Sequence, residues 1–422
     1  MSESEPDLHE SEEATDGFAV SLGDPRPAGS RHMWQRSAVT ITDGRVIAGT
    51  VDGRVSAFPI ALSGYGDEPE PSWTATIADE YAVSLEDGPE GTVAVGGRGE
   101  GGIVAAIDAT TGERRWSYRS ADDLGEPQKE SLFFLPYVVS VATDGERIYA
   151  AARRYERDGG ERSFRSAVYA FDPDGDLVWT YRADASPIAI DLREGRLAVA
   201  YNRCPGDHRT GLVVLDTETG DPQLTWDPGC EGDRRVGDAS LLADGVAVAS
   251  HGDYRGYRLD ETGRERWSVD LARPTEVGEE TLYAYPNHVH ATGEGVAFVT
   301  GNTYPEEGRE AEGRHPHEHT ITAFTPDGTE RWHAPVGGWV SELAAADGTI
   351  ATPGAQRFRD RDPDSHGLRR YDLVEGPMTG ISIEGVVTAA AMTDRRVAVI
   401  EEPVEYHDGD AVRGGYRLHV SA

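Results

Sequence analysis

An all-β fold made of repeated four-stranded units is predicted by two features of the sequence. A phrase with an Asp, a Gly and a closing Trp, AIDATTGERRW at 106–116, returns in variant form four more times, at intervals of roughly 40 to 65 residues. Alternating apolar runs ending at Asp-Gly or Glu-Gly surround each copy, with no helical periodicity between them. The sequence therefore predicts a single eight-bladed β-propeller with four antiparallel strands in each blade. The further copies span 170–179, 214–226, 258–267 and 323–332.

Each predicted blade repeats the same order of strands. The first strand ends at Asp-Gly or Glu-Gly, the second is a run rich in Ala and Val, the third ends in the recurring polar turn, and the fourth opens with a large side chain. The second-strand run occurs eight times, which sets the blade count. Seven blades would follow if the first or last repeat were irregular. The predicted fourth-strand anchors are Phe18, Trp73, Trp116, Trp179, Trp226, Trp267, Trp332 and Met378.

The last blade needs a fourth strand from elsewhere, because the chain stops after the third strand, YRLHVSA. The segment FAVSLGDPRP at 18–27 aligns with WSVDLARP at 267–274, so residues 18–22 are predicted to pair with the C-terminal strand. This pairing would close the ring and leave no open sheet edge. Residues 1–16 are acidic and are predicted to form a disordered tail, which leaves 17–422 for the propeller.

The phrase hydrophobic-Asp-x-x-Thr-Gly-x-x-x-Trp resembles the PQQ-like β-propeller repeat of quinoprotein dehydrogenases and of the lipoprotein in the bacterial Bam outer-membrane assembly complex. The resemblance covers residues 18–422 and implies a propeller whose Trp side chains wedge between blades. Family members without quinone are common, and this chain lacks a vicinal cysteine pair, a secretory signal and a second cofactor domain. No cofactor is therefore predicted, with pyrroloquinoline quinone and calcium as the runner-up.

The charge balance is strongly acidic, with 75 Asp and Glu against 40 basic residues, of which only Lys129 is a lysine. A dense carboxylate surface stays hydrated in molar salt, so the composition predicts a high-salt organism, with a merely acidic mesophile as the alternative. The net charge of −35 argues against nucleic-acid binding. No apolar stretch is long enough to span a membrane and the N-terminus lacks an apolar signal core, which predicts a cytoplasmic protein.

One face of the predicted propeller carries the long insertions, and such loops often form the binding face of a repeat protein. The insertions span 153–165, 202–210, 302–319, 356–367 and 402–414. Residues that open the innermost strands on this face are predicted to line the channel mouth and to bind a ligand or partner. The alternative is ordinary packing between blades, with water. The predicted mouth residues are Trp34, Tyr81, Tyr137, Arg235, Tyr285, His288, Trp339 and Glu342.

Three smaller groups of residues could carry chemistry. His315, His317 and His319 alternate in RHPHEHT, which would place three imidazoles on one side of a strand and could bind a transition metal. Cys204 and Cys230 fall on the same face and could form a disulfide, or remain free thiols in a reducing cytoplasm. Arginine clusters at 153–165 and 357–370 could meet an anionic partner, or pair with the Asp and Glu between them.

The sequence favours a non-catalytic binding or scaffold module that presents its loop-rich face to a protein partner, either as a monomer or within a complex. Two enzymatic alternatives stay open: a quinone-dependent and calcium-dependent oxidoreductase, and a metal-dependent hydrolase or lyase at the histidine cluster. The formal G-x-G-x-x-G at Gly97–Gly102 is followed by a strand, so it is a hairpin turn rather than a phosphate cradle. No nucleophile or phosphate-binding motif was found that would favour catalysis.

Overall fold

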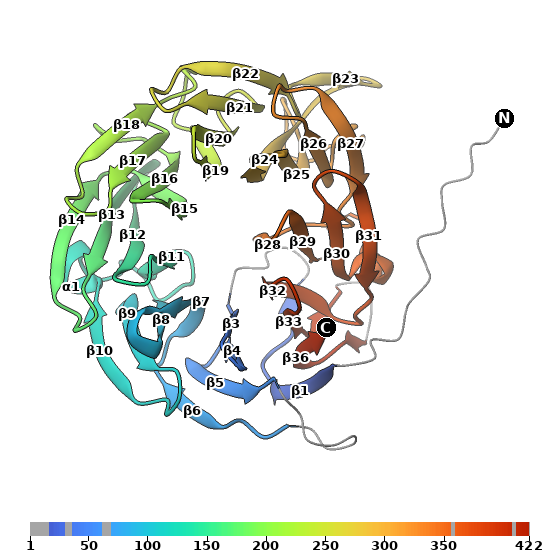
Figure 1. Ribbon diagram of the computed structural model, residues 1–422. Coiled ribbons are helices and arrows are strands. Elements are labelled where there is room, and N and C mark those ends of the chain that lie inside the picture. The colour runs from blue at the N-terminus through green and yellow to red at the C-terminus, as the bar shows by residue number, and fades with distance from the viewer. Residues whose placement is uncertain (1–16, 30–35, 61–68, 356–358, 407–410, 422) are drawn as a thin grey trace.

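The computed structural model describes residues 17–29, 36–60, 69–355, 359–406 and 411–421. Antiparallel sheets stand around a central opening, with consecutive strands of a unit running from the centre to the rim (Figure 1). The only α-helix in these ranges is the short α1 (Ala121–Leu124), and no helix here is long and apolar enough to cross a membrane. The protein is thus all-β, as the sequence predicts.

The units follow one another along the chain, and each takes four consecutive strands. The first consists of β3 (Ala38–Thr42), β4 (Arg45–Gly49), β5 (Arg54–Pro59) and β6 (Trp73–Thr76). The second consists of β7 (Tyr81–Gly88), β8 (Thr92–Arg98), β9 (Ile103–Asp108) and β10 (Arg114–Arg119). The third consists of β11 (Tyr137–Thr143), β12 (Ile148–Asp158), β13 (Glu161–Phe171) and β14 (Leu177–Ala183), and the single pair Tyr137–Arg98 joins it to the second.

The same order continues through the second half of the chain. The fourth unit consists of β15 (Ser186–Arg193), β16 (Arg196–Arg203), β17 (Leu212–Asp216) and β18 (Pro222–Trp226), and the fifth of β19 (Val236–Leu242), β20 (Gly245–Ser250), β21 (Arg255–Asp260) and β22 (Glu265–Asp270). A sixth unit has an extra strand: β23 (Thr275–Val277), β24 (Glu280–Thr292), β25 (Gly295–Pro305), β26 (Thr320–Phe324) and β27 (Glu330–Pro335). The next consists of β28 (Ala344–Ala346), β29 (Thr349–Gly354), β30 (Gly367–Asp372) and β31 (Gly376–Ile381).

The two ends of the chain share the last sheet. This sheet has the order β1 (Phe18–Gly23), β36 (Tyr416–Ser421), β33 (Val397–Glu402) and β32 (Val386–Met392). Phe18 lies opposite Val420, and the inward side chains Val20 and Leu22 are buried. A small sheet beside it contains β2 (Ala28–Gly29), β34 (Val404–Glu405) and β35 (Val412–Arg413). The N-terminal segment thus supplies the outer strand that the C-terminal repeat lacks.

Tryptophan side chains connect neighbouring units near the rim. Each indole lies at the start of an outer strand and donates its N–H to a backbone carbonyl in the polar turn of the following unit, which satisfies the one polar group of a large apolar ring. The donations run from Trp73 to Ala109 (3.0 Å), Trp116 to Pro173 (3.0 Å), Trp179 to Thr217 (2.9 Å), Trp267 to Pro326 (2.9 Å) and Trp332 to Leu373 (3.3 Å).

The turn glycine of the repeated phrase leaves room for the ring. Gly175 has φ of +88°, and a Cβ built on it would lie 2.5 Å from Cγ of Trp116. A side chain at this position would therefore meet both an unfavourable backbone conformation and the indole of the preceding unit. The Asp-x-x-Thr-Gly-x-x-x-Trp spacing thus encodes a contact between two units, with the glycine of one receiving the tryptophan of the other.

The anchor predicted at Trp226 is wrong by two residues. In other units the anchor pairs with the residue two positions before the Asp or Thr that begins the polar turn, as Trp179 does with Ala170. In the fourth unit the equivalent residue is Val214, and its partner is Leu224. Leu224 also lies against Gly263 of the next unit, where a Cβ added to the glycine would lie 3.5 Å from Leu224 Cδ1. Trp226 pairs with Leu212 instead and packs on Tyr257, with ring centroids 4.9 Å apart. The prediction chose the anchor by its aromatic side chain, but the register between the strands decides which residue takes the anchor position.

One predicted anchor is more exposed than the tryptophans. Met378 has the anchor register, opposite Arg370, but its side chain is 41% exposed. The linear, flexible Met therefore covers less of the joint than a Trp side chain does. Phe18 is partly buried, as Trp116 and Trp179 are, and packs on the cluster formed by the last sheet and the first unit.

Replacing Trp179 by Phe is expected to lower the free energy of unfolding by about 1 kcal/mol, because Phe keeps the ring but loses the hydrogen bond to Thr217. Trp226→Phe is the matched control, since its indole N–H has no partner among the described residues. Equilibrium denaturation followed by circular dichroism measures both variants. Equal losses for the two would show that the bond across the joint contributes nothing.

Deleting residues 1–30 removes β1 and β2 and is expected to lower the melting temperature by at least about 5 °C. Val20 and Leu22 would leave the core, and β36 would become an unpaired edge that favours association. Calorimetry and light scattering measure both effects, with deletion of 1–15 as the control. If the shorter chain melts at the same temperature and stays monodisperse, β1 is not part of the fold.

Candidate functional site

The innermost strands surround the opening. Backbone N–H groups on the edge of each strand toward the opening need acceptors, because no further strand covers that edge. Side chains of the preceding unit supply these acceptors. The donors and acceptors are Val141 N to Ser84 Oγ (3.0 Å), Leu241 N to Asp191 Oδ2 (2.5 Å), Val289 N to Asp238 Oδ2 (2.9 Å), Ala291 N to Ser240 Oγ (3.1 Å) and Ala390 N to Glu342 Oε1 (3.0 Å). These carboxylates and hydroxyls therefore hold units together around the channel.

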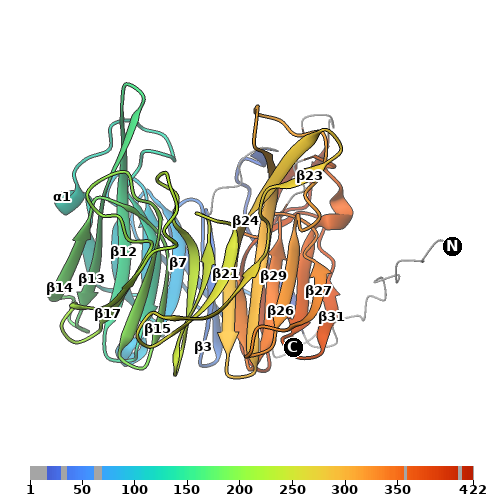
Figure 2. The same cartoon turned by 90° about the horizontal axis from the view of Figure 1, so that it is seen from above.

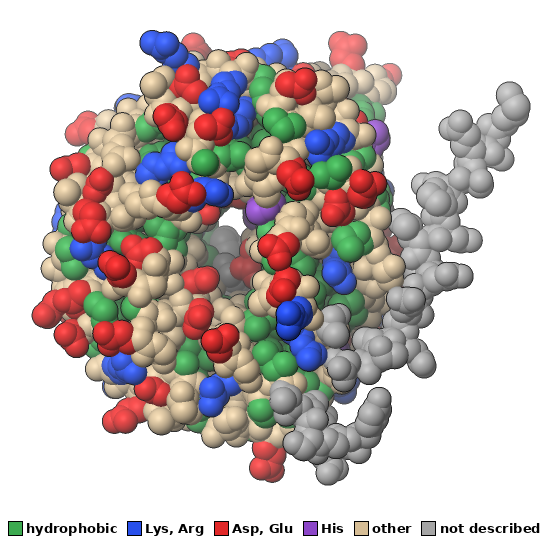
Figure 3. Space-filling view, viewed as in Figure 1, with side chains coloured by type: hydrophobic (Ala, Val, Ile, Leu, Met, Phe, Trp, Pro, Cys, Tyr) green, Lys and Arg blue, Asp and Glu red, His purple; other side chains and the backbone are tan. Residues whose placement is uncertain are grey.

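The centre of the molecule holds a cavity of about 730 Å³. Figure 3 shows the hollow in a view along the opening, with acidic side chains spread over the visible face. Side chains from all the innermost strands line it, and they include Ser84, Tyr137, Asp191, Asp238, Tyr285, His288 and Glu342. A cavity of this size can receive a small ligand or a few side chains of a partner.

Two long β arms project from one face of the molecule, which we call the mouth face (Figure 2). One arm is the β12–β13 hairpin. Its neighbour β11 begins at the pair Tyr137–Arg153, and the hairpin extends beyond that pair to Asp158. The β24–β25 pair extends likewise to Leu282 and Pro305, with β23 added at its edge. The arms stand on either side of the cavity entrance, so the long insertions predicted on one face are strands as well as loops.

The structure brings five of the predicted mouth residues to the cavity. Tyr137, Tyr285, His288, Trp339 and Glu342 all line it. His288 donates from Nε2 to the carbonyl oxygen of Val340, at 2.9 Å, and its Nδ1 lies 3.8 Å from Asp238 Oδ2. These residues come from the third, sixth and seventh units, which lie on opposite sides of the opening (Figure 1).

Three predicted mouth residues are not among those that line the cavity. Trp34 lies outside the described residues. Tyr81 pairs with Arg98 at the end of β8. Arg235 is buried, with Nε 2.8 Å from Asp227 Oδ2, while its neighbour Arg234 lines the cavity instead. Successive side chains on an extended segment point to opposite sides, so the prediction named the wrong member of the Arg234–Arg235 pair.

Arg98, Arg153 and Arg234, which we call the mouth arginines, are the cavity residues that the sequence reasoning missed as a set. Arg98 and Arg153 both approach the ring of Tyr137, with guanidinium carbons 4.6 and 5.4 Å from its centroid. Arg234 lies 4.5 Å from the centroid of Tyr285 and donates to Asn202 Oδ1 at 3.2 Å. A signal was present for two of them, because an Arg follows the small residues of the second strand in GGR (Arg98) and in AAR (Arg153). Arg234 lies two residues before β19 and shares no such pattern.

Burial changes the ionisation of this region. It lowers the pKa of Arg153 to about 10 and also lowers the pKa of Arg98, while it raises the pKa of Tyr137. The positive charge of Arg98 lowers the pKa of Arg153 further, whereas the phenol of Tyr137 favours its charged form. Arg98 and Arg153 are therefore cationic at neutral pH but poorly hydrated, which strengthens any contact that they make with an anion.

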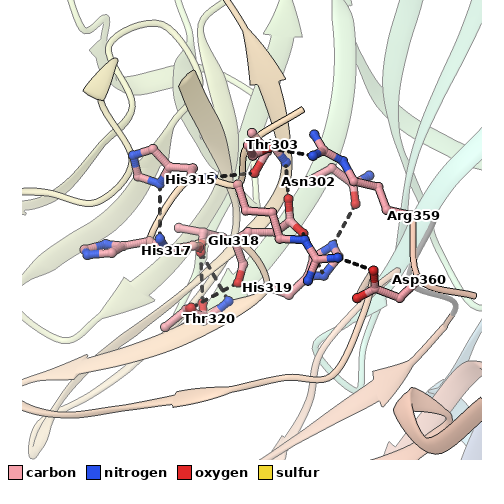
Figure 4. Close-up of polar contacts among 12 residues, drawn as sticks. Asn302, Thr303, His315, His317, Glu318, His319, Thr320, Arg359 and Asp360 are labelled. Atoms are coloured by element: carbon pink, nitrogen blue, oxygen red, sulfur yellow. Dashed lines mark hydrogen bonds and ion pairs between the residues drawn. The ribbon is translucent and has the colours of Figure 1, made fainter. Parts of the chain in front are cut away.

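The histidine run does not form the predicted alternating strand. Residues 315–319 make a turn that precedes β26, with His319 at φ of +49°. His315 contacts the carbonyl of Arg273 through Nε2 (3.1 Å) and accepts from the His317 backbone N–H, while His319 contacts Asn302 Oδ1 at 2.7 Å (Figure 4). The rings of His315 and His317 lie 5.6 Å apart, centroid to centroid, while His319 reaches Asn302 instead. Because residues 316–319 form a turn and not a strand, the expectation of three alternating imidazoles on one side of a strand was wrong.

Metal-binding geometry is not found elsewhere in the described ranges either. Over residues 17–421 apart from the undescribed segments, no group of three His, Cys, Asp or Glu side chains lies close enough to hold an ion. The carboxylates nearest the opening, Asp191, Asp238 and Glu342, accept backbone N–H groups, as described above. Calcium takes six to eight oxygen ligands. The described donor set does not fit calcium with a quinone, and no redox step follows from it.

The disulfide considered between Cys204 and Cys230 is not formed. Both thiols are free: Cys204 is buried with Sγ 3.6 Å from the Thr210 carbonyl, and Cys230 lies 3.5 Å from the Arg234 carbonyl. Burial raises the pKa of Cys204 to about 12 and also raises that of Cys230. Both side chains therefore stay protonated at neutral pH and act as small apolar groups.

Solved propellers share this architecture over nearly the whole chain. BamB from Moraxella catarrhalis matches with a TM-score of 0.53 at 16% identity, covering 96% of this chain and 97% of that one. Quinohemoprotein alcohol dehydrogenase from Comamonas testosteroni matches with a TM-score of 0.57 at 11% identity, covering 96% and 75%. Sqt1 from Chaetomium thermophilum, bound to the N-terminus of the ribosomal protein L10, matches with 0.58 at 11%, covering 91% and 95%. These likenesses define a β-propeller.

A family profile makes the assignment more specific. The profile described as outer membrane protein assembly factor BamB matches residues 69–240 and 165–301, which together span more than half of the chain. The chain belongs to this family of PQQ-like propeller repeats. No curated protein sequence matches it detectably. Relatives that share the fold include both binding proteins and dehydrogenases, so fold membership does not decide the activity.

The wall carboxyl Asp238 is expected to make stability depend on pH. Burial raises its folded pKa from 3.8 to about 7, so the folded state holds the proton more tightly than the unfolded chain. Its contribution is fully present below about pH 4 and is lost as the pH rises through 7. Asp238→Asn keeps an acceptor for Val289 N–H but removes the titration, and should shrink the fall in unfolding free energy between pH 5 and 8 by about 1–3 kcal/mol.

Denaturation at several pH values measures this effect as the difference between variant and wild type. Asp216→Asn is the control, because hydrogen bonds from its turn lower the pKa of Asp216 and its titration lies below the window. The control should leave the slope between pH 5 and 8 unchanged. A slope that Asp238→Asn does not alter would contradict the assigned pKa.

Proposed function

We propose that this protein is a non-catalytic binding module: an eight-bladed ring, closed by β1, that holds a protein partner on its mouth face. The observation that carries the proposal is the arrangement of that face. Two β arms flank a cavity of about 730 Å³, and cationic and aromatic side chains gather at its entrance. Arginine and tyrosine are the side chains that contribute most to protein interfaces.

Hydrogen bonds between the last sheet and the first unit support this role. Buried residues tie the last sheet to the first unit: Glu402 accepts from Ser37 Oγ and Thr388 Oγ, both at 3.0 Å, and Tyr416 OH receives the Val51 N–H at 3.1 Å. A partner that docks on such a scaffold meets strands and arms already in place, which keeps the entropy loss of binding small.

The roles of the wall carboxylates favour binding over catalysis. Asp191, Asp238 and Glu342 each accept a backbone N–H of the next inner strand. Groups engaged in holding units together are poorly placed to exchange protons with a substrate. Sqt1, a propeller of the same shape, is bound to the N-terminus of a ribosomal protein, which supports a peptide-holding role for a ring of this kind.

Exposed aromatic side chains on the mouth face provide the test. Phe133, which is 45% exposed and stacks edge-on against Tyr155 at 4.4 Å, precedes β11, and Tyr304 is 38% exposed on β25. The Phe133→Ala/Tyr304→Ala double variant should reduce recovery of the partner at least about tenfold, as expected for loss of aromatic contacts. Leu177→Ala/Val374→Ala is the matched control, with 45% and 37% exposure near turns on the other face.

Affinity purification of each tagged variant from the native cell, followed by quantitative mass spectrometry, measures the recovery. We propose a cytoplasm of high salt on the basis of the acidic composition, so the purification is run at 0.2 M and 2 M KCl. A partner recovered equally with all variants would contradict the assignment of the mouth face. Recovery only at the lower concentration would contradict the proposal of high salt.

A further inference from the structure

The mouth arginines Arg153 and Arg234 differ from the buried arginines that lie outside the cavity. Those arginines each pair with a carboxylate, and the pairs are Arg154 with Glu156, Arg235 with Asp227 and Arg258 with Asp244. Arg153 and Arg234 have no such partner among the described residues, and they use neutral acceptors instead, Ser186 Oγ and Asn202 Oδ1. Both line the same cavity.

This arrangement is unfavourable without an anion. A guanidinium withdrawn from water needs hydrogen bonds and an opposite charge to offset its desolvation, and like charges nearby add to the penalty. Arg153 has Arg98 and Arg203 close enough to disfavour its charge. Such a cluster in a chain with a net charge of −35 is the feature that composition predicts least. Arg153 and Arg234 both line the cavity, where a carboxylate could accept guanidinium N–H groups in pairs.

Tyrosines beside Arg234 form a wall suited to a peptide. Tyr283, Tyr285 and Tyr304 lie with ring centroids 5.4 to 5.8 Å apart, and Tyr254 adds to the group at 4.9 Å from Tyr283. Arg234 stacks on Tyr285, which fixes the plane of its guanidinium. Flat amphipathic rings contact backbone and side-chain methylenes at little entropic cost. The tyrosine wall and the two arms flank the cavity entrance. This shape suits an extended peptide segment better than a small molecule that the protein would enclose.

The geometry points to an acidic peptide segment of the partner as the occupant of the mouth, with Arg153 and Arg234 each receiving a carboxylate. This inference rests on the proposed binding function and names the chemistry of the partner. Enclosed bidentate pairs suit a high-salt setting, because at 1 M salt charges exposed to solvent are screened beyond about 3 Å while enclosed pairs are screened much less. At the lower salt concentration the acidic outer surface also repels the same segment elsewhere, which directs it to the mouth.

N-acetylated hexaglutamate amide carrying a fluorophore is the probe, and anisotropy titration of the full chain at 0.2 M and 2 M KCl is the measurement. The wild type is expected to bind it, and Arg153→Gln/Arg234→Gln to weaken binding at least about tenfold, the loss expected for charge-assisted hydrogen bonds. Arg153→Lys keeps the positive charge but lacks the planar guanidinium. Its affinity for the probe should therefore lie between that of the wild type and that of the double variant. Arg395→Gln, at an 85% exposed side chain in the β32–β33 turn, is the matched control and should bind as the wild type does.

Three results would overturn the inference. Hexaglutamine competing as well as hexaglutamate would show that charge is not recognised. Inorganic phosphate competing at the peptide's own concentration would show a small-anion site. Equal losses for Arg395→Gln would show a non-specific charge effect. Circular dichroism and melting curves of each variant identify any that is misfolded, and Arg234→Gln alone then replaces the double variant.

The outcomes separate this inference from the proposed function. If the aromatic variants abolish partner recovery but hexaglutamate does not bind, the mouth face still holds a partner and the acidic chemistry is wrong. If hexaglutamate binds through Arg153 and Arg234 but partner recovery is the same in all variants, the anionic site stands and the assignment of the protein-binding face is wrong.

Discussion

The structure depends on satisfying the inner edge of every sheet. An innermost strand faces the opening with backbone N–H groups that no further strand covers, and buried unpaired donors would be costly. The chain solves this by projecting a Ser, Asp or Glu from one unit toward the next inner strand, as Asp191 does for Leu241 and Glu342 for Ala390. These bonds place polar side chains around the opening and leave the middle of the molecule hollow.

A second layer of contacts joins the units nearer the rim. The tryptophan of one unit donates to the polar turn of the next and rests on its glycine, as with Trp116, Pro173 and Gly175. The inner layer is polar and the outer layer is largely apolar, so neighbouring units are fixed at both radii. The inner strands also carry bulges two residues after they begin, for example between Ala82 and Ser84 and between Val138 and Ser140. A bulge bends the strand and redirects its side chains at the mouth.

The same design leaves the mouth face free to diversify. Because the two layers hold the ring, β12 and β13 can lengthen into an arm and an Arg can end a second strand without loss of the fold. Arginine and tyrosine side chains therefore gather around the cavity at the mouth face, and they contrast with the acidic balance of the whole chain.

The sequence by itself determined the repeat, the order of strands and the contribution of residues 18–22 to the last sheet, because period-two alternation and the Asp-Gly turns are local signals. Only the tertiary structure decided which side chains meet. Arg234 rather than Arg235 enters the cavity, and Leu224 rather than Trp226 takes the anchor position, because one or two residues of register turn a side chain to the other side of a strand. The free state of the two cysteines and the turn conformation of the histidine run were likewise decided by the tertiary structure, since turn geometry between strands is set by contacts distant in the sequence.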